Sequence, residues 1–301
     1  MMRTILIISL WVLALTAAAQ PRVFVGRITD RQHRGIPFAI VQVKDKAQGV
    51  YTDENGAFAF TADAAEVQTL VFFCMGYEKK ELPVAGLPAD SIMVTLNSQA
   101  TALREVAITG RKGKARTATL GNSRRQLHHD GECYRNYGAE TAIKLKADTA
   151  HDGVLKEVFV YITGDGDWRT RFRVHVYEWD SLPGRELTDS NIIVAATRPD
   201  SWVRVDLSAL RIPVNEGLFI SMEWISGHGN TQQVLGSEKH PEVTAYNGQV
   251  PGLTTGYGKP SRTYSRKPFS KEWEWFDDAA APRKGGYFLN PMIYATYSYV
   301  P

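Results

Sequence analysis

One stretch of the sequence carries the clearest structural signal: Gly49-Val50-Tyr51-Thr52-Asp53-Glu54-Asn55-Gly56-Ala57-Phe58-Ala59-Phe60. The Tyr and Thr before its centre favour an extended chain, and Phe58 and Phe60 fall on one face of a strand at a period of two. Between them, Asp53 and Asn55 can bond their own backbone and Gly56 tolerates a positive φ, which is the chemistry of a turn. The stretch predicts a β-hairpin inside a small β-domain.

Short apolar runs separated by turn residues continue on both sides of this stretch, without the period of a helix. Further strands are expected at residues 23–28, 37–43, 70–74 and 92–96. Several short strands in about 80 residues are typical of a β-sandwich. A calcium loop at Asp53 and Asn55 is the alternative to a turn, but the later bidentate Glu of an EF-hand loop is missing, which favours the turn.

An ordered set of motifs gives a more specific indication. The motifs are Gly26-x-Ile28-x-Asp30, Gly35-Ile36-Pro37, Ala39-x-Val41-x-Val43, Thr52-Asp53-x-Asn55-Gly56-x-Phe58, Gly76-Tyr77 and Leu103-x-Glu105-Val106. Together they resemble the carboxypeptidase-regulatory-like domain over about residues 21–110. The resemblance implies a seven-stranded, transthyretin-like sandwich without catalytic residues of its own. In Gram-negative envelopes such domains also precede TonB-dependent receptors, but the roughly 190 residues that follow lack the repeated strand pattern of a membrane barrel.

The N-terminus has the pattern of a secretory signal peptide, residues 1–19. It has a basic start, an apolar run over residues 5–15 and an Ala-rich cleavage site. We therefore expect an exported protein of the periplasm or the outer-membrane surface, without a transmembrane segment after cleavage. The chain carries 35 Lys and Arg against 32 Asp and Glu, and this near-balance gives no indication of nucleic-acid binding.

The expected organisation is a first domain over residues 20–97, a basic linker over 98–125 and a second domain over 126–301. The linker is interpreted as solvated, with contact to anionic lipid or glycan as the alternative. Long alternating strands are expected in the second domain, among them residues 171–179, whose Arg and His face should meet solvent. An antiparallel, jelly-roll-like β-sandwich is the most economical fold for this part. The fold class expected for the whole chain is all-β.

A long loop over residues 226–285 is the best functional lead in the second domain. Loops of this length are often functional, and this one is rich in aromatic and charged residues. The candidate ligand-binding residues are Tyr257, Tyr264, Trp273, Trp275 and Arg266. Aromatic faces can stack on sugar rings, as in many carbohydrate-binding modules. The alternative is that Trp273 and Trp275 only cover the edge of the sandwich.

The search for catalytic chemistry gives weak signals. His129-x-x-Glu132 has the spacing of two zinc ligands in metallocarboxypeptidases, but an all-β chain does not provide the α/β catalytic domain of that class. Asp206 and Glu223 are formal candidates for a carboxylate pair. Asp165 and Asp167 could hold calcium, but a plain hairpin loop is favoured. No nucleophile elbow or phosphate loop is present, and no cofactor is expected.

The two cysteines leave two states open. Cys74 lies in an apolar strand and Cys133 in the expected second domain, which favours separate thiols over a Cys74–Cys133 disulfide.

The sequence therefore predicts an exported, non-enzymatic binding or accessory protein of the cell envelope, with a glycan or envelope polymer as ligand. The alternative is a scaffold that docks onto an outer-membrane protein by strand addition, through an edge of the first domain or residues 103–110. A hydrolase with a dispersed site is the third possibility.

Overall fold

The computed structural model describes residues 21–88, 91–99, 113–121, 123, 132–133, 138–147, 152–166, 168–225, 251–258, 262–275 and 288–301. These residues form strands, turns and one short 3-10 turn, η1 (Ser208–Leu210). The prediction of an all-β chain is confirmed. No helix in this part of the chain is long and apolar enough to cross a membrane. The expected signal peptide, most of the expected linker and residues 103–110 lie outside the described residues.

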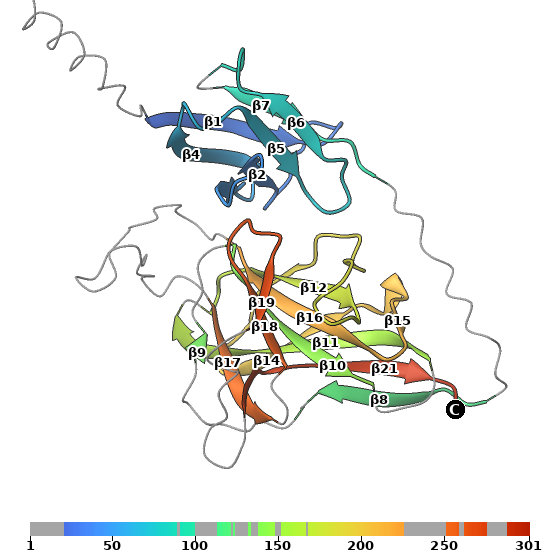
Figure 1. Ribbon diagram of the computed structural model, residues 1–301. Coiled ribbons are helices and arrows are strands. Elements are labelled where there is room, and N and C mark those ends of the chain that lie inside the picture. Colours follow the sequence, from blue (N-terminus) through green and yellow to red (C-terminus); the bar gives the residue numbers. More distant parts are fainter. Residues whose placement is uncertain are drawn as a thin grey trace, which may run out of the picture.

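The first domain contains seven strands in two sheets (Figure 1). They are β1 (Pro21–Thr29), β2 (Ile40–Val43), β3 (Gly49–Tyr51), β4 (Ala57–Asp63), β5 (Thr69–Phe73), β6 (Lys80–Pro83) and β7 (Ile92–Thr95). The strand order is β4-β1-β7 in one sheet and β3-β2-β5-β6 in the other. Phe24 and Ile28 of β1 meet Leu70 and Phe72 of β5 in one buried core. The two sheets therefore pack as a sandwich.

The turn predicted at its centre is present, but the strands beside it do not pair with each other. β3 pairs with β2, whereas β4 pairs with β1 in the other sheet. Asp53 Oδ1 accepts hydrogen bonds of 2.8 Å from the N–H groups of Asn55 and Ala57, and Gly56 has a φ of 79°. The Ile28 N–H of β1 donates to Gly56 O at 2.8 Å. The prediction of a hairpin is therefore wrong, because the chain crosses here from one sheet to the other.

The second domain contains a six-stranded and an eight-stranded sheet. Its strands are β8 (Arg116–Gly121), β9 (Glu132–Cys133), β10 (Glu140–Lys146), β11 (Gly153–Gly166), β12 (Phe172–Glu178), β13 (Ile193–Val194), β14 (Ser201–Asp206), β15 (Pro213–Val214), β16 (Gly217–Trp224), β17 (Pro251–Gly258), β18 (Thr263–Arg266), β19 (Trp273–Trp275), β20 (Phe288–Pro291) and β21 (Ile293–Tyr299). The six-stranded sheet has the order β13-β12-β16-β10-β18-β19. The other sheet follows β20-β17-β11-β21-β8, with β14 and β15 paired to β11 and β9 paired to β17.

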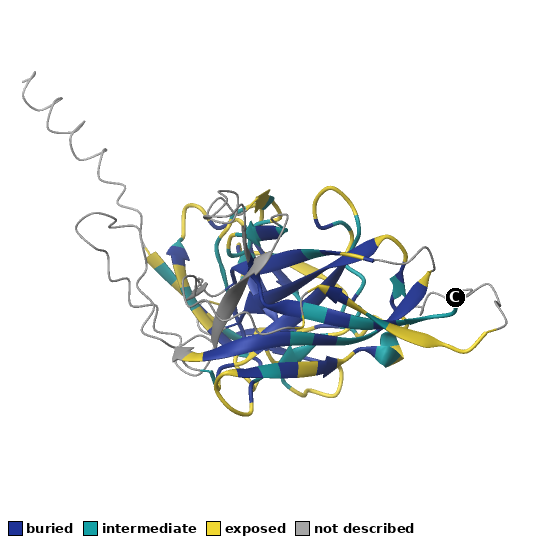
Figure 2. Cartoon of the chain, turned by 90° about the horizontal axis from the view of Figure 1, so that it is seen from below, coloured by how far each residue is buried: buried dark blue, intermediate teal, exposed yellow. Residues whose placement is uncertain are grey.

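The inner faces of these two sheets share one hydrophobic core. Val174 and Val176 of β12 and Ile220 of β16 contribute from the six-stranded sheet, and Val158 and Val160 of β11 from the other. Figure 2 shows buried residues running along most strands, whereas exposed residues lie at turns and along edge strands such as β8. This core covers the inner face of the six-stranded sheet, and the outer face of that sheet lies outside the core. The transthyretin-like and jelly-roll-like topologies stay predictions.

The expectation of one long loop over residues 226–285 is wrong for the described part. β17, β18 and β19 lie within it, and β18 pairs with β10 while β19 pairs with β18. The expected linker likewise contains β8, which pairs with β21. The expected loop around Asp165 is wrong in the same way, because β11 extends to Gly166. Such strands are stabilised by partners far away in the sequence, so the local pattern does not reveal them.

Cys74 is a buried, free thiol. For Cys133 only the backbone is described, so the preference for separate thiols stays a prediction.

Replacement of Gly56 by Ala should destabilise the first domain by about 3 kcal/mol, because a positive φ strains Ala and the new Cβ adds a clash. That Cβ would lie 2.3 Å from Ile28 O. Gly86→Ala is the matched control, since Gly86 has a φ of 93° and open space around the same position. The control should lose only about 1 kcal/mol. Urea unfolding measures the free energy lost in each variant, and equal losses would contradict the close approach of the β1 backbone to Gly56.

Candidate functional site at the domain junction

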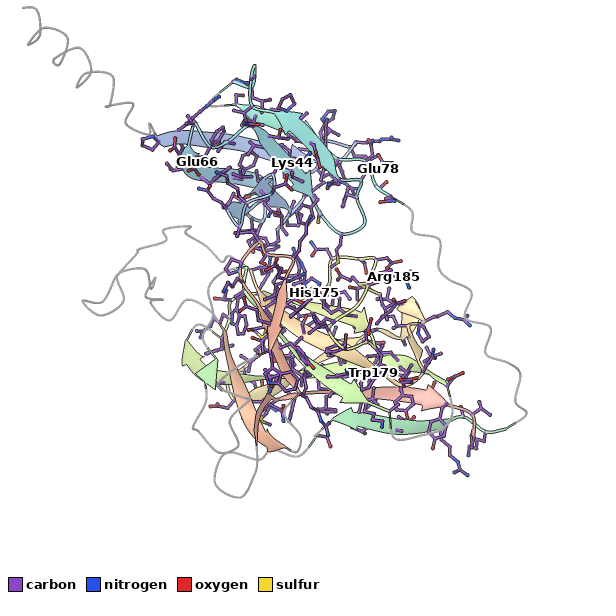
Figure 3. All side chains as sticks on the ribbon, in the orientation of Figure 1. Lys44, Glu66, Glu78, His175, Trp179 and Arg185 are labelled. Carbon is purple, nitrogen blue, oxygen red and sulfur yellow. The ribbon has the colours of Figure 1, made fainter. Side chains whose placement is uncertain are left out.

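The outer face of the six-stranded sheet carries charged side chains that are buried. On β12, Arg173, His175 and Tyr177 alternate with the residues that face the core, and Arg173 and His175 are each only 4% exposed. The prediction that this face of residues 171–179 meets solvent is wrong. The first domain lies over one part of the face, and Figure 3 shows His175 where the two domains meet.

Glu223 of β16 is the centre of these contacts. Glu223 is only 5% exposed, and its carboxylate accepts hydrogen bonds from both domains. Tyr51 of the first domain donates its hydroxyl to Oε1. Arg173 Nη1 donates to Oε2 at 2.7 Å, and His175 Nε2 lies 3.1 Å from the same oxygen. A buried carboxylate needs such partners, because leaving it unpaired costs several kcal/mol.

Arg173 connects the carboxylate to the main chain of the first domain. Its Nη2 donates to Phe38 O at 2.6 Å, and its Nε donates to Asn191 Oδ1 at 2.6 Å. Phe38 has a φ of 54°, a left-handed conformation that is uncommon for a bulky residue. The first domain thus holds a strained backbone position where its carbonyl meets the guanidinium group.

A second buried carboxylate, Glu140 of β10, lies on the same face. Tyr177 donates its hydroxyl to Glu140 Oε1 at 2.7 Å, and Ser221 donates to the same oxygen. Arg266 of β18 donates to Oε2. The guanidinium of Arg266 also lies 4.8 Å from the ring centroid of Trp273. Arg266, one of the predicted ligand-binding residues, is therefore engaged inside the protein.

Six charged side chains make up what we call the junction network: Glu140, Glu186, Glu223, Arg173, His175 and Arg266. Burial alone would lower the pKa of His175, but the charges of Glu140 and Glu186 and its hydrogen bonds raise it to about 10. Burial would raise the pKa of Glu223, but the charge of Arg173 and the protonated His175 hold it well below its usual range. Three carboxylates thus face three cations, and the network is suited to holding the two domains together.

An apolar contact surrounds the part of the network that reaches the first domain. Phe38, Ile40 and Tyr51 pack against Ile225 of the second domain, with Phe269 against the edge. Gln42 Nε2 also donates to Phe269 O at 2.8 Å. Excluding water from this contact strengthens the ion pairs beside it.

Four of the five predicted ligand-binding residues lie together on β18 and β19. Tyr264 pairs with Trp275, and Arg266 pairs with Trp273. Tyr264 is buried and Trp273 is half-buried, whereas Trp275 is 46% exposed. Tyr257 is not with them, because β17 belongs to the eight-stranded sheet. The alternative of edge-covering aromatics therefore fits Tyr264 and Trp273, and Trp275 is the residue available to a ligand.

Trp275 is one end of a row of aromatic rings across the outer face, which we call the aromatic band: Trp179, Phe219, Tyr264 and Trp275. The ring centroids are 6.3, 5.3 and 5.1 Å apart in that order. Lys144 Nζ lies 4.5 Å from the ring centroid of Trp179 and 5.1 Å from that of Phe219. The two inner rings are buried, and the two tryptophans at the ends are partly exposed.

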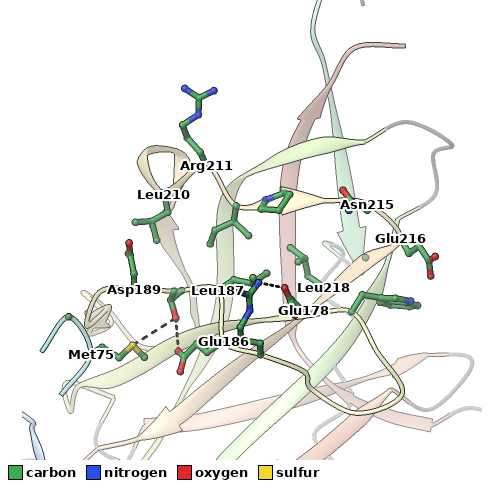
Figure 4. Close-up of a pocket in the computed structure, with 17 residues that line it drawn as sticks. Met75, Glu178, Glu186, Leu187, Asp189, Leu210, Arg211, Asn215, Glu216 and Leu218 are labelled. Atoms are coloured by element: carbon green, nitrogen blue, oxygen red, sulfur yellow. Dashed lines mark hydrogen bonds and ion pairs between the residues drawn. The ribbon is translucent and has the colours of Figure 1, made fainter. Parts of the chain in front are cut away.

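A groove of about 700 Å³ adjoins the band at Trp179. Met75 and Gly76 of the first domain line one end, and residues from the strand ends and loops of the second domain line the rest. Figure 4 shows Leu187, Leu210 and Leu218 among carboxylate side chains. Glu186 belongs to both the groove and the junction network, because it bonds Nδ1 of His175 at 2.6 Å.

One signal of the junction can be read in the sequence. Glu223 is a carboxylate in a strand that is otherwise mostly apolar, which is a sign of buried pairing. The candidate pair of Glu223 with Asp206 is wrong, because Asp206 is exposed on β14 of the other sheet. Trp179 could not be connected with Trp275, since their strands are far apart in the sequence.

The described residues give no support for a metal site at the candidate ligands named from the sequence. In that part of the chain, no group of three or more His, Cys, Asp or Glu is placed to hold a metal ion. His129 and Asp167 lie outside it, and for Glu132 and Asp165 only the backbone is described.

Arg173→Met should lower the free energy of unfolding by about 3 to 5 kcal/mol, because it leaves the Glu223 carboxylate buried beside an apolar side chain. The matched control is Arg204→Met, which removes an exposed partner of Glu157 and should cost about 1 kcal/mol or less. Chemical unfolding of the two variants measures the difference. Similar losses would show that the junction network does not hold the fold.

The stability should also fall as the pH rises above neutrality. The folded protein keeps the His175 proton up to a pKa of about 10, whereas the usual value is 6.5. The stabilisation from this proton is fully present below the usual pKa of 6.5, and it is lost as the pH rises toward the His175 pKa of the folded protein. The slope is at most about 1.4 kcal/mol per pH unit for one proton. Unfolding between about pH 7 and 8.5, below the usual range of Tyr and Lys, should give a smaller slope for His175→Gln; an unchanged slope would contradict the protonated state.

A comparison with known families gives one match. Residues 24–108 match the family described as the CarboxypepD_reg-like domain, and no curated protein matches the chain. The match includes β1 to β7 and ends before β8, so the second domain is outside it. This confirms the resemblance inferred from the ordered motifs. The chain thus carries a CarboxypepD_reg-like match over its first sandwich, joined by a buried ionic network to a second β-domain that the match does not cover.

Proposed function

We propose that this protein is an exported, non-enzymatic accessory protein of the Gram-negative envelope that binds a glycan or envelope polymer on the aromatic band. A binding or accessory role fits both the CarboxypepD_reg-like domain and the all-β fold. The glycan, the export and the absence of catalysis are parts of the proposal.

The aromatic band is the observation that supports a sugar polymer. It runs from Trp179, directly after β12, to Trp275 of β19, and its successive ring centroids are 6.3, 5.3 and 5.1 Å apart. The partly exposed Trp179 and Trp275 at its ends offer faces for sugar rings, and Trp is well suited to combine apolar stacking with a hydrogen bond. Lys144 between them brings ammonium donors for hydroxyl groups. An extended ligand matches this spacing better than a compact one.

The junction network supports the same proposal indirectly. The network holds the first domain on one part of the sheet, so the aromatic band lies beside a domain whose position is fixed. Ligand sites occur preferentially at such domain interfaces and are usually formed before the ligand arrives. The first domain would therefore contribute position rather than ligand contacts of its own.

The proposal is tested by a screen of glycans and envelope polymers against the purified protein and its Trp275→Ala variant. We expect a hit whose affinity falls about tenfold or more in the variant, as for central tryptophans of other interfaces. Trp202→Ala is the matched control, since Trp202 is also partly buried but lies on β14 of the other sheet. No hit in the screen, or equal binding by Trp275→Ala and the wild type, would contradict the proposal.

A second function, docking on an outer-membrane protein, has one specific observation in its favour. Val23 and Val25 of β1 and Met93 of β7 are exposed on the three-stranded sheet, and β4 is an edge strand of that sheet. Exposed apolar side chains near a free edge are typical of strand-mediated contacts. Crosslinking in intact envelopes with Met93→Lys as the comparison distinguishes this function, because the variant should lose a partner without losing glycan binding.

A further inference from the structure

The groove has an excess of acidic side chains. Those that line it include four carboxylates and two cationic groups: Glu178, Glu186, Asp189, Glu216, Arg185 and Arg211. Arg185 pairs with Glu178, and the side chain of Arg211 points away from the other lining residues (Figure 4). Among the described residues, the carboxylates of Asp189 and Glu216 have no hydrogen-bond or ion-pair partner. Within the groove the unpaired charge is therefore negative, and the Lys144 ammonium lies at its border, 4.5 Å from the ring centroid of Trp179.

Apolar side chains line the groove beside these charges. They are Leu187, Leu210, Ile212 and Leu218. Apolar walls reduce the local dielectric constant, so an ion pair at their rim is stronger than one in open water. The volume of about 700 Å³ is within the usual range for small-molecule sites.

The groove and the aromatic band are continuous at Trp179. This side chain lines the groove and is also the first ring of the band. Gly217, which lines the groove as well, lies against the Trp179 ring; a Cβ added there would be 2.6 Å from a ring atom. The indole therefore belongs to both surfaces, so one extended ligand can contact the groove and the band.

We propose that the glycan bound on the band carries free amino groups and that the groove receives one or more of them beside Trp179. The inference rests on the proposed function and specifies the class of its ligand. A primary ammonium group is compact and offers three donors, so it can reach Asp189 or Glu216 without displacing the Glu178–Arg185 pair. Acidic glycans are disfavoured by the same carboxylates, since like charges brought together reduce affinity.

The experiment compares oligomers of glucosamine with fully N-acetylated oligomers of equal length. The two have the same sugar backbone, but at about pH 6 the first carries mostly protonated amines, whereas the second carries neutral acetamides. The unacetylated oligomer should bind on the order of fivefold to tenfold more tightly, as two partly exposed ion pairs allow. This preference should decrease between about 0.05 and 0.3 M salt, because ions screen exposed charges.

Charge-removing variants assign the effect to the groove. Asp189→Asn and Glu216→Gln together should remove the preference for the amine and leave the affinity for the acetylated oligomer unchanged. Glu66→Gln is the matched control: it removes one carboxylate from the first domain, distant from Trp179 and Arg185 (Figure 3), and should keep the preference. Urea unfolding verifies that the variants are folded.

The outcomes separate the two proposals. Equal binding of the two oligomers, a preference that survives in the groove variant, or binding only of other neutral glycans would overturn the inference and leave the proposed function standing. Failure of every glycan to bind would overturn both. Loss of all binding in Trp275→Ala, together with loss of only the amine preference in the groove variant, would support both.

Discussion

The carboxylate of Glu223 has to be paired, because it is buried where two domains meet. The protein meets this requirement with one partner from the first domain, Tyr51, and two from β12, Arg173 and His175. A buried ion pair adds little stability over apolar packing, but an unpaired charge is severely unfavourable. We infer that the arrangement acts mainly on specificity, because the carboxylate and the guanidinium are both satisfied only when Tyr51 and the Phe38 carbonyl reach them.

This requirement gives the first domain a part in shaping the site. Its turn after β5 supplies Met75 and Gly76 to the groove, while its four-stranded sheet covers the charged part of the six-stranded sheet. The aromatic band lies on another part of this face, where Phe219 and Tyr264 are buried and only Trp179 and Trp275 at its ends are partly exposed. Glu186 lies where the junction network meets the groove.

Much of the fold was predictable because alternation and turn chemistry are local. The all-β class, the strands around Phe24, Leu70 and Val174 and the turn at Gly56 follow from short windows of sequence. The pairing of β3 and β4 with other strands does not, since turn residues specify a reversal and not its partners. The same limit applies to the site: Trp273 and Trp275 could be found in one segment, whereas Trp179 becomes their neighbour only through sheet order. Burial of the Arg and His face of β12 required the other domain.

The hydrogen bond from Arg173 to Phe38 O has a consequence for how the interface can change over evolutionary time. A main-chain carbonyl is the same in every residue, so the acceptor persists through any substitution at this position that preserves the left-handed backbone. The apolar contact of Phe38 with Ile225, in contrast, depends on the identity of the side chain at position 38. Recognition between the domains therefore has a part that is insensitive to amino-acid replacement and a part that is sensitive to it. Insertions or deletions in the segment that carries Phe38 would disturb both parts at once, which makes its length more constrained than its composition.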